Sequence, residues 1–289
     1  MKKILYLITT SLVVFTLFSC KRNIDDNGDV LNDYQTPLAG INGPRALAKE
    51  NINDLVMLHY LYNGAKLEAT VASDGALTEI MNNGNLIYQI KYNGKLATDS
   101  AEVVQYYTYN TNEKLTEIAE TQRIISLATP AVATKKYKHK YVLTYNTADK
   151  LSNIVKHSGL DVPGSAFNFT DYEKYNFTYT GENLTGLTID RGQITSTGTL
   201  GPSQNQTIYS YQNYDTKFSP YTTLNWGYNL HYMLRDQVYG FHLSANNPGK
   251  VIVSGTTIPT PVNYTSTFSY DLQNYAITGF GYNFIYKPL

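Results

Sequence analysis

Alternation of bulky and polar side chains is the dominant pattern in this chain, and it is clearest at residues 136–154. Tyrosine, histidine and leucine occupy every second position from Tyr137 to Tyr145, while lysine, valine and threonine lie between them. This period of two is typical of a β-strand with one packed face and one solvated face. The Asn-Thr-Ala-Asp sequence at 146–149 favours a turn, because Asn and Asp bond to nearby backbone. We predict a strand, a turn and a returning strand from Lys150.

The same hairpin unit recurs along the chain. In each copy a tyrosine ends one strand, three to five turn residues follow, and leucine or a substitute opens the next strand. The copies lie at residues 61–67, 91–96, 108–118, 136–154, 178–187 and 269–277. The Asn-Gly pairs at 63–64 and 93–94 are typical of tight hairpin turns. In several copies a second aliphatic residue follows the leucine three positions later. Either both faces of the strand are partly covered, or a β-bulge brings the two side chains onto one face.

Other segments complete the predicted architecture. We predict further strands at 55–62, 251–253, 264–270 and 282–286, a short helix at 44–50 beginning with Pro44, and a long loop or loose edge hairpin at 191–207. Residues 213–241 are rich in aromatic side chains, and Ser219-Pro220 is typical of a helix start. The prediction is an all-β fold: an antiparallel up-and-down meander of repeated hairpins in a strongly curved or barrel-like sheet. A short helical or loop segment is expected to cover one face.

The outward-facing positions argue against strands in contact with lipid. A lipid-facing sheet needs aliphatic side chains across the bilayer, with aromatic ones gathered at its two interfaces. Here the candidate positions carry tyrosine throughout, or Lys136, Lys138 and Lys140. A lysine at the bilayer midplane costs about 2–4 kcal/mol. We therefore expect a soluble domain.

The amino terminus has the composition of an export signal. Two lysines precede a mostly apolar run at 4–18, which is short for a membrane span and typical of a signal-peptide core. The run ends in Leu17-Phe18-Ser19-Cys20, which resembles a bacterial lipobox. The resemblance implies cleavage before Cys20 and acylation of its thiol and new amine, which together give stable anchoring. Cys20 is the only cysteine in the chain, so no intrachain disulfide competes for it.

These features divide the chain into a signal peptide at 1–19, a flexible tether at 20–43 and a single β domain at 44–289. The tether is polar and contains Asp25-Asp26. This pair is similar to the short acidic surface-export signal of Bacteroidetes lipoproteins, although it lies farther from the cysteine. The resemblance implies a lipid-anchored outer-membrane protein exposed at the cell surface. A periplasm-facing location is the alternative.

The repeated unit Tyr-x-Tyr-(Asn/Asp/Thr)…(Lys/Asn)-Leu-x-x-Ile resembles the YD repeats of Rhs-type proteins. The hairpins are followed by Y-D-T-K-F-S-P-Y at 214–221, L-S-A-N-N at 243–247 and a last hairpin at 268–277. This order is similar to a family of uncharacterised Bacteroidetes lipoproteins with a porin-like β fold. The resemblance covers roughly residues 55–286, and the chain departs from it in lacking Asp after most strand-end tyrosines. The family has no established activity to carry over.

Composition narrows the function classes. Acidic and basic residues balance at 23 each, so the chain has no electrostatic footprint for nucleic acid. Neither a His-Glu-x-x-His nor a Gly-x-Ser-x-Gly sequence occurs, and we expect no cofactor and no metal. His231 and His242 flank the aromatic segment and are the histidines closest to a shared site. The candidate carboxylates for a glycosidase are Asp171, Glu173, Asp215, Asp236 and Asp271. For Asp215 and Asp271, which follow strand-end tyrosines, we favour a role in turns.

The aromatic segment holds the candidate ligand-binding residues, Trp226, Tyr221, Tyr228 and Tyr232. Aromatic faces with polar rims can stack on sugar rings. The competing interpretation, which we favour for these residues, is that they form a core lid over the sheet. We predict a surface lipoprotein of binding or structural type, with a glycan or a surface protein as its partner. The alternative is an extracellular polysaccharide hydrolase that uses loop carboxylates.

Overall fold

The computed structural model describes residues 44–53, 55–95, 99–126 and 133–289. Cys20 and the predicted tether therefore lie outside the described residues. Within them the strands are β1 (Arg45–Ile52), β2 (Leu55–Asn63), β3 (Lys66–Ala72), β4 (Leu77–Asn83), β5 (Leu86–Lys95), β6 (Asp99–Tyr109), β7 (Leu115–Ser126), β8 (Ala133–Tyr145), β9 (Leu151–Leu160), β10 (Asp171–Thr180), β11 (Asn183–Gln193), β12 (Asn205–Tyr214), β13 (Pro248–Gly255), β14 (Ile258–Thr265), β15 (Ser269–Tyr270), β16 (Ala276–Gly279) and β17 (Tyr282–Pro288). The helical elements are η3 (Pro220–Thr223), α2 (Trp226–Arg235) and η4 (Gln237–Leu243).

All strands belong to one antiparallel sheet. Each strand from β1 to β14 pairs with the next in sequence. β15 pairs with β16, β16 with β17, and β17 returns to β1. The sheet is not closed, and β14, which contains Pro259 and Pro261, is exposed along almost its whole length. None of the helices described is both long and apolar enough to span a bilayer. The predicted all-β meander is confirmed.

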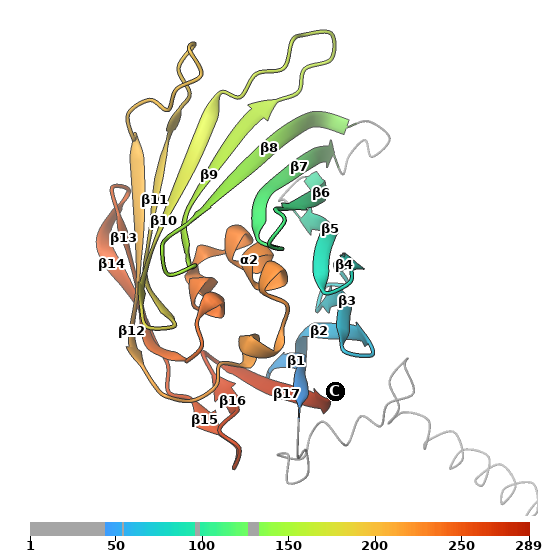
Figure 1. Cartoon of the computed structure of the whole chain (residues 1–289), viewed down its shortest axis with the longest axis vertical. Coiled ribbons are helices and arrows are strands. Elements are labelled where there is room, and N and C mark those ends of the chain that lie inside the picture. The colour runs from blue at the N-terminus through green and yellow to red at the C-terminus, as the bar shows by residue number, and fades with distance from the viewer. Residues whose placement is uncertain (1–43, 54, 96–98, 127–132) are drawn as a thin grey trace, which may run out of the picture.

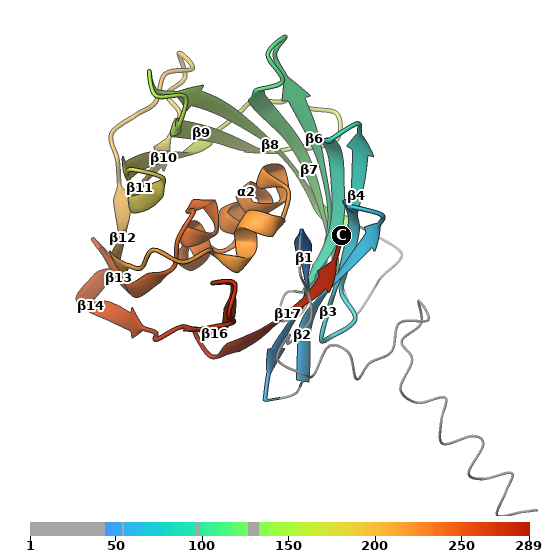
Figure 2. The same ribbon diagram turned by 60° about the horizontal axis from the view of Figure 1, so that its bottom comes forward.

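The sheet curves around η3, α2 and η4, which we call the inner helical segment (Figures 1 and 2). Hydrogen bonds attach this segment to strands on several sides. Thr223 Oγ1 accepts from the Leu47 amide of β1 at 3.0 Å, and the Tyr211 hydroxyl of β12 donates to the Gln237 carbonyl at 2.6 Å. Leu230 and Met233 of α2 are buried in the hydrophobic core between helix and sheet. The predicted covering segment is therefore present and lies on the concave face.

A β-bulge determines which face the two aliphatic residues of a repeat occupy. In the β6–β7 pair, Thr108 is opposite Glu117 while Tyr109 is opposite Leu115, so Thr116 is an extra residue. Both Leu115 and Ile118 are buried in the core as a result. The same shift occurs between β8 and β9 and between β10 and β11. Of the two alternatives that the sequence leaves open, the bulge is the one present.

A hydroxyl side chain occupies the bulge in each of these three hairpins. Thr116 donates to the Thr108 carbonyl at 3.1 Å, and Ser152 donates to the Thr144 carbonyl at 3.1 Å. Thr185 makes the equivalent bond to the Thr178 carbonyl at 3.2 Å. This recurrent bond across the strand pair fixes the extra residue at the same register in each copy.

The strand-end tyrosines connect one hairpin to the hairpin before it. Tyr109 donates its hydroxyl to the Ile87 carbonyl at 2.8 Å, and Tyr145 donates to the Leu115 carbonyl at 2.9 Å. Each acceptor lies at the start of a return strand, where the bulge also occurs. Phenylalanine cannot make this bond, which gives a physical reason for tyrosine at these positions.

The turn chemistry predicted for the repeats is also present. The Asn146 carboxamide oxygen accepts from the backbone amides of Ala148 and Lys150, at 3.0 Å each. Asp149 then adopts a positive φ of 65° before β9 begins. Asn110 makes the same pair of bonds in the β6–β7 turn.

Several local predictions are wrong. Residues 45–52 form strand β1 and not a helix, because they pair with both β17 and β2 and are buried from Arg45 to Glu50. Tertiary pairing here outweighs the helix propensity of the segment. Asn93-Gly94 is not a turn, since β5 continues through it and Gly94 pairs with Ala101. The strand predicted at 264–270 is interrupted between β14 and β15. Of the two alternatives for 191–207, the long loop is present, at 194–204, whereas an edge hairpin is wrong because β11 and β12 each pair with strands on both sides.

Replacing Tyr145 by Phe should remove the bond to Leu115 while keeping the ring. We expect the free energy of unfolding to fall by about 1 kcal/mol, as for a typical net hydrogen bond. Urea unfolding followed by circular dichroism measures this. The matched control is Tyr106→Phe on β6, where the side chain is 53% exposed and the change should stay within about 0.5 kcal/mol. Equal effects of the two variants would contradict a stabilising role for the hydroxyl.

Candidate functional site

The start of α2 brings the single tryptophan to the surface at the end of the sheet where the tight turns lie. Asn225 caps the helix, since its side-chain oxygen accepts from the Gly227 amide at 2.8 Å. Its side-chain nitrogen donates to the Asn85 carbonyl of the β4–β5 turn at 2.9 Å. These two bonds fix the helix start beside the turn. Trp226, the first residue of the helix, is 40% exposed.

A groove of about 520 Å³ lies beside Trp226. Three strand-end tyrosines from successive hairpins, Tyr109, Tyr145 and Tyr179, line it and are half-buried. We call this the turn-end groove; its remaining lining residues are Leu86, Asn112, Glu113, Lys114, Leu115, Asp149, Lys150, Leu151, Glu182, Asn225, Gly227 and Leu243. It therefore combines aromatic faces with amide, ammonium and carboxylate groups, a composition typical of a site for a polar ligand with apolar surfaces.

Two lysines cross the groove from one hairpin to the next. The Lys114 ammonium lies 4.6 Å from the centre of the Tyr145 ring and forms an ion pair with Asp149. The Lys150 ammonium lies 5.6 Å from the centre of the Tyr179 ring. It is also 2.8 Å from Oε1 of Glu182. The ion pairs are partly exposed and contribute little stability, but the lysines limit the positions open to the tyrosine rings.

The predicted ligand-binding residues separate into two groups. Trp226 lies at the groove, whereas Tyr221 and Tyr228 are only 2% exposed and belong to the hydrophobic core. Tyr232 is partly buried and packs against His242, with ring centroids 5.0 Å apart. These three tyrosines act as the core lid that we considered as the competing interpretation. The groove tyrosines are not among the predicted ligand-binding residues, although the repeat places them at equivalent strand ends.

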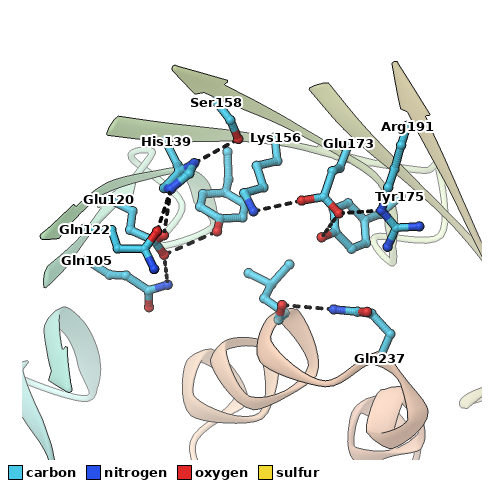
Figure 3. A network of polar contacts seen from close by, with 12 residues as sticks. Gln105, Glu120, Gln122, His139, Lys156, Ser158, Glu173, Tyr175, Arg191 and Gln237 are labelled. Atoms are coloured by element: carbon cyan, nitrogen blue, oxygen red, sulfur yellow. Dashed lines mark hydrogen bonds and ion pairs between the residues drawn. The ribbon is translucent and has the colours of Figure 1, made fainter. Parts of the chain in front are cut away.

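A second polar cluster lies on the inner face of β6–β11, above α2 (Figure 3). We call it the inner polar belt: Gln105, Glu120, His139, Lys156, Glu173 and Arg191. Glu120 accepts from Gln105 at 2.6 Å and from the Tyr141 hydroxyl at 3.2 Å. Glu173 lies between two cations, 2.8 Å from Lys156 and 3.0 Å from Arg191.

The belt also attaches α2 to the sheet through a neutral histidine. His231 Nδ1 lies 2.8 Å from Gln105 Oε1, which accepts from the Tyr107 hydroxyl as well. Burial lowers the pKa of His231 to about 3, so the ring is neutral near pH 7. Because the Gln105 oxygen is an acceptor, Nδ1 carries the proton and donates it. His231 is thus a structural contact between the helix and β6.

The pKa values of the two glutamates of the belt shift in opposite directions, because only Glu173 lies between two cations. Burial raises the pKa of Glu120, and the hydrogen bond from Gln105 only partly offsets this. Burial also acts to raise the pKa of Glu173, but Lys156 and Arg191 outweigh it and the pKa is lowered. Burial lowers the pKa of His139 to about 4, so its contact with Glu120 at 3.7 Å is not an ion pair near neutral pH. The two carboxylates therefore have separate partners.

The remaining candidate carboxylates have structural partners. Asp215 and Asp271 each accept a backbone amide two residues ahead, at 2.9 Å, as we favoured from their positions after tyrosines. Asp236 caps η4 by accepting from the Val238 amide, and Asp171 accepts from the Thr170 hydroxyl. In the part of the chain that the structure describes, no three His, Cys, Asp or Glu side chains are grouped to hold a metal ion.

Comparison with known proteins gives only distant likenesses. No family model matches the sequence. No curated protein matches it either. Among solved structures, the chain is similar to a porin-like protein from Bacteroides vulgatus ATCC 8482, with 11% identity and a TM-score of 0.45, over 85% of this chain and 100% of that one. It is also similar to a porin-like protein from Bacteroides uniformis ATCC 8492, with 14% identity and a TM-score of 0.35, over 77% of this chain and 80% of that one.

A buried carboxyl group lies apart from both clusters, at the contact between β1 and the inner helical segment. Glu50 is buried and accepts from the Tyr60 hydroxyl at 2.6 Å. Burial raises its pKa to about 7, although hydrogen bonds from Tyr60 and Tyr221 act in the opposite direction. The native state therefore holds a proton on Glu50 at pH values where the unfolded chain has lost it.

The stability that this proton provides is fully present below the unfolded pKa of about 4.5 and is lost as the pH rises through about 7. Glu50→Gln mimics the protonated form and removes this dependence. The free energy of unfolding of the variant, relative to wild type, should rise by up to about 3 kcal/mol between pH 5 and pH 8. Urea unfolding at the two pH values measures it, with Glu79→Gln at an exposed position of β4 as the control. A difference that does not change with pH would contradict this assignment.

Proposed function

We propose that the protein is a binding module displayed on the bacterial outer membrane, held by lipid at Cys20, and that it binds carbohydrate in the turn-end groove. The observation that carries this proposal is the position of Trp226. The single tryptophan of the chain lies 40% exposed at a groove lined by three half-buried tyrosines. Flat aromatic faces bordered by polar groups are suited to sugar rings, which have apolar faces and polar edges.

The hydroxyl bonds of the tyrosines determine what they can offer a ligand. Tyr109 and Tyr145 donate their hydroxyl protons to backbone carbonyls, so their rings are held in place. Polar recognition then falls to side chains such as Asn112 and Glu182, which are exposed at the groove. Preorganised ring faces with polar groups at their edges reduce the ordering cost of binding.

Two of the three carboxylates of the groove have a lysine partner, and this favours binding over hydrolysis. Asp149 pairs with Lys114, and Glu182 pairs with Lys150. A hydrolase of the two-carboxylate type needs one acid that stays protonated and one base that stays ionised. Asp149 and Glu182 have the same type of partner, a lysine of the preceding hairpin. This arrangement gives no basis for assigning them the two different roles.

The membrane attachment rests on the sequence Leu17-Phe18-Ser19-Cys20, and exposure at the cell surface rests on the acidic tether. Lipid on Cys20 would leave 24 residues before β1, which separates the domain from the bilayer. A lipid-anchored domain of this kind can present a groove to polymers outside the cell.

Trp226→Ala should weaken carbohydrate binding at least tenfold, because stacking residues at the centre of a site contribute about 1.4 kcal/mol or more. A glycan array identifies ligands of the wild-type protein, and calorimetry compares affinities. Tyr106→Ala removes an aromatic ring of similar exposure outside the groove and should leave the affinity unchanged. Carbohydrate binding that survives Trp226→Ala would exclude this site. Binding to a surface protein alone would replace carbohydrate as the ligand class.

Cys20→Ser should release the protein from membranes, because the acylated thiol is lost. Fractionation and incorporation of labelled palmitate into the wild type measure this. Protease treatment of intact cells then distinguishes the two locations, since only a surface-exposed domain is digested. Membrane attachment that persists in the variant would show that the protein is held in another way.

A further inference from the structure

The turn-end groove is built from repeated units, which we call rungs. In the first rung Lys114 of one hairpin lies against Tyr145 and pairs with Asp149 of the next. In the second rung Lys150 lies against Tyr179 and pairs with Glu182 of the hairpin after that. The groove thus presents the same chemical set twice, displaced by one hairpin. A compact ligand has no need for such repetition.

The strand spacing gives the length of the turn-end groove. Tyr109, Tyr145 and Tyr179 end β6, β8 and β10, which are two strands apart in the sheet. Neighbouring strands are separated by about 4.8 Å, so successive tyrosines are separated by roughly 10 Å, and the first and third by roughly 19 Å along the sheet. A groove of about 520 Å³ that reaches from Tyr109 to Tyr179 is long for its volume.

Trp226 lies at one end of the turn-end groove. The Asn225 side chain bonds to Asn85, and the Cα of Gly227 faces Ile87 and the Tyr109 hydroxyl. Tyr179 and Glu182 come from the hairpin farthest from this point. The groove therefore has two aromatic side chains, Trp226 and Tyr109, at one end, and Tyr179 at the end farther from Trp226.

The charges of the groove disfavour a polyanion. Its charged lining residues are two lysines, Lys114 and Lys150, and three carboxylates, so the formal charge is −1. Each lysine is already neutralised by a carboxylate of the next hairpin. An acidic polysaccharide or a nucleic acid would meet no uncompensated positive charge here.

The turns also disfavour an extended peptide. A peptide that adds to a sheet edge binds through backbone hydrogen bonds. In the turns at this end, the amides of Asn112 and Lys114 bond to Asn110, and those of Ala148 and Lys150 bond to Asn146. A ligand must therefore be held by ring faces and side chains.

We infer that the turn-end groove binds a linear, uncharged oligosaccharide that runs across successive hairpins, from Trp226 towards Tyr179, with one subsite at each hairpin. The inference rests on the proposed function and specifies its ligand. The same side-chain set recurring at a fixed spacing matches a polymer of recurring units. Affinity then increases with chain length until the last subsite is filled.

The test uses the full lipoprotein in detergent and neutral gluco-, xylo- and manno-oligosaccharides of one to six units, with affinities from calorimetry. For the series that binds, the tetrasaccharide should bind at least tenfold more tightly than the monosaccharide. Trp226→Ala should weaken all lengths. Tyr179→Ala should weaken the tetrasaccharide at least fivefold and leave the monosaccharide within twofold. Tyr179→Phe keeps the ring and should retain wild-type affinity, which checks that a loss in Tyr179→Ala is local.

Three outcomes would overturn the inference alone. The first is Trp226-dependent binding whose affinity does not depend on chain length, and the second is equal weakening of all lengths by Tyr179→Ala. The third is tighter binding of alginate, an acidic polysaccharide measured for comparison, than of the neutral chains. Failure of every oligosaccharide to bind would overturn the proposed function as well. The two failures are therefore distinguishable.

Discussion

The bulge at the start of the return strands is the constraint on which the rest of this fold depends. A regular strand would place Leu115 and Ile118 on opposite faces, and the core would lose one of them in each repeat. The extra residue at Thr116, Ser152 and Thr185 brings both aliphatic side chains inward. It also increases local twist and bending, which a sheet needs if it is to curve around a helix. In these three hairpins one inserted hydroxyl residue thus serves packing and curvature together.

The concave face of the sheet contains both an apolar core and buried polar groups. Leu230 and Met233 of α2 pack into the core, while His231 of the same helix bonds to Gln105 on the sheet. Apolar packing tolerates small shifts of a helix, whereas a hydrogen bond to a buried amide accepts one distance and orientation. The polar contacts therefore specify where the inner helical segment lies, and the apolar contacts supply most of the stability.

The repeat predicts most of the hairpins, because tyrosine, turn residues and leucine are all local signals. The copy at 91–96 is the exception, since β5 runs through it. The face of the sheet that the Ile118 side chain occupies was not predictable, because the alternation of side chains along a strand does not reveal an extra residue. The sequence predicts a helix at β1, because Ala46, Leu47 and Ala48 are good helix formers, and only pairing with β17 and β2 overrides that preference. The groove tyrosines were visible as repeat positions, but their meeting with Trp226 depends on the Asn225–Asn85 bond between segments 140 residues apart. Such long-range contacts leave no local pattern.

The exposed strand at the open side of the sheet has a consequence for the protein at high concentration. An unpaired strand edge is a template for the strand of another molecule, and pairing between copies leads to aggregation. Pro259 and Pro261 deprive β14 of two backbone donors and stiffen it in place. A second copy would thus pair poorly with the edge of β14, so the protein can stay monomeric at high concentration.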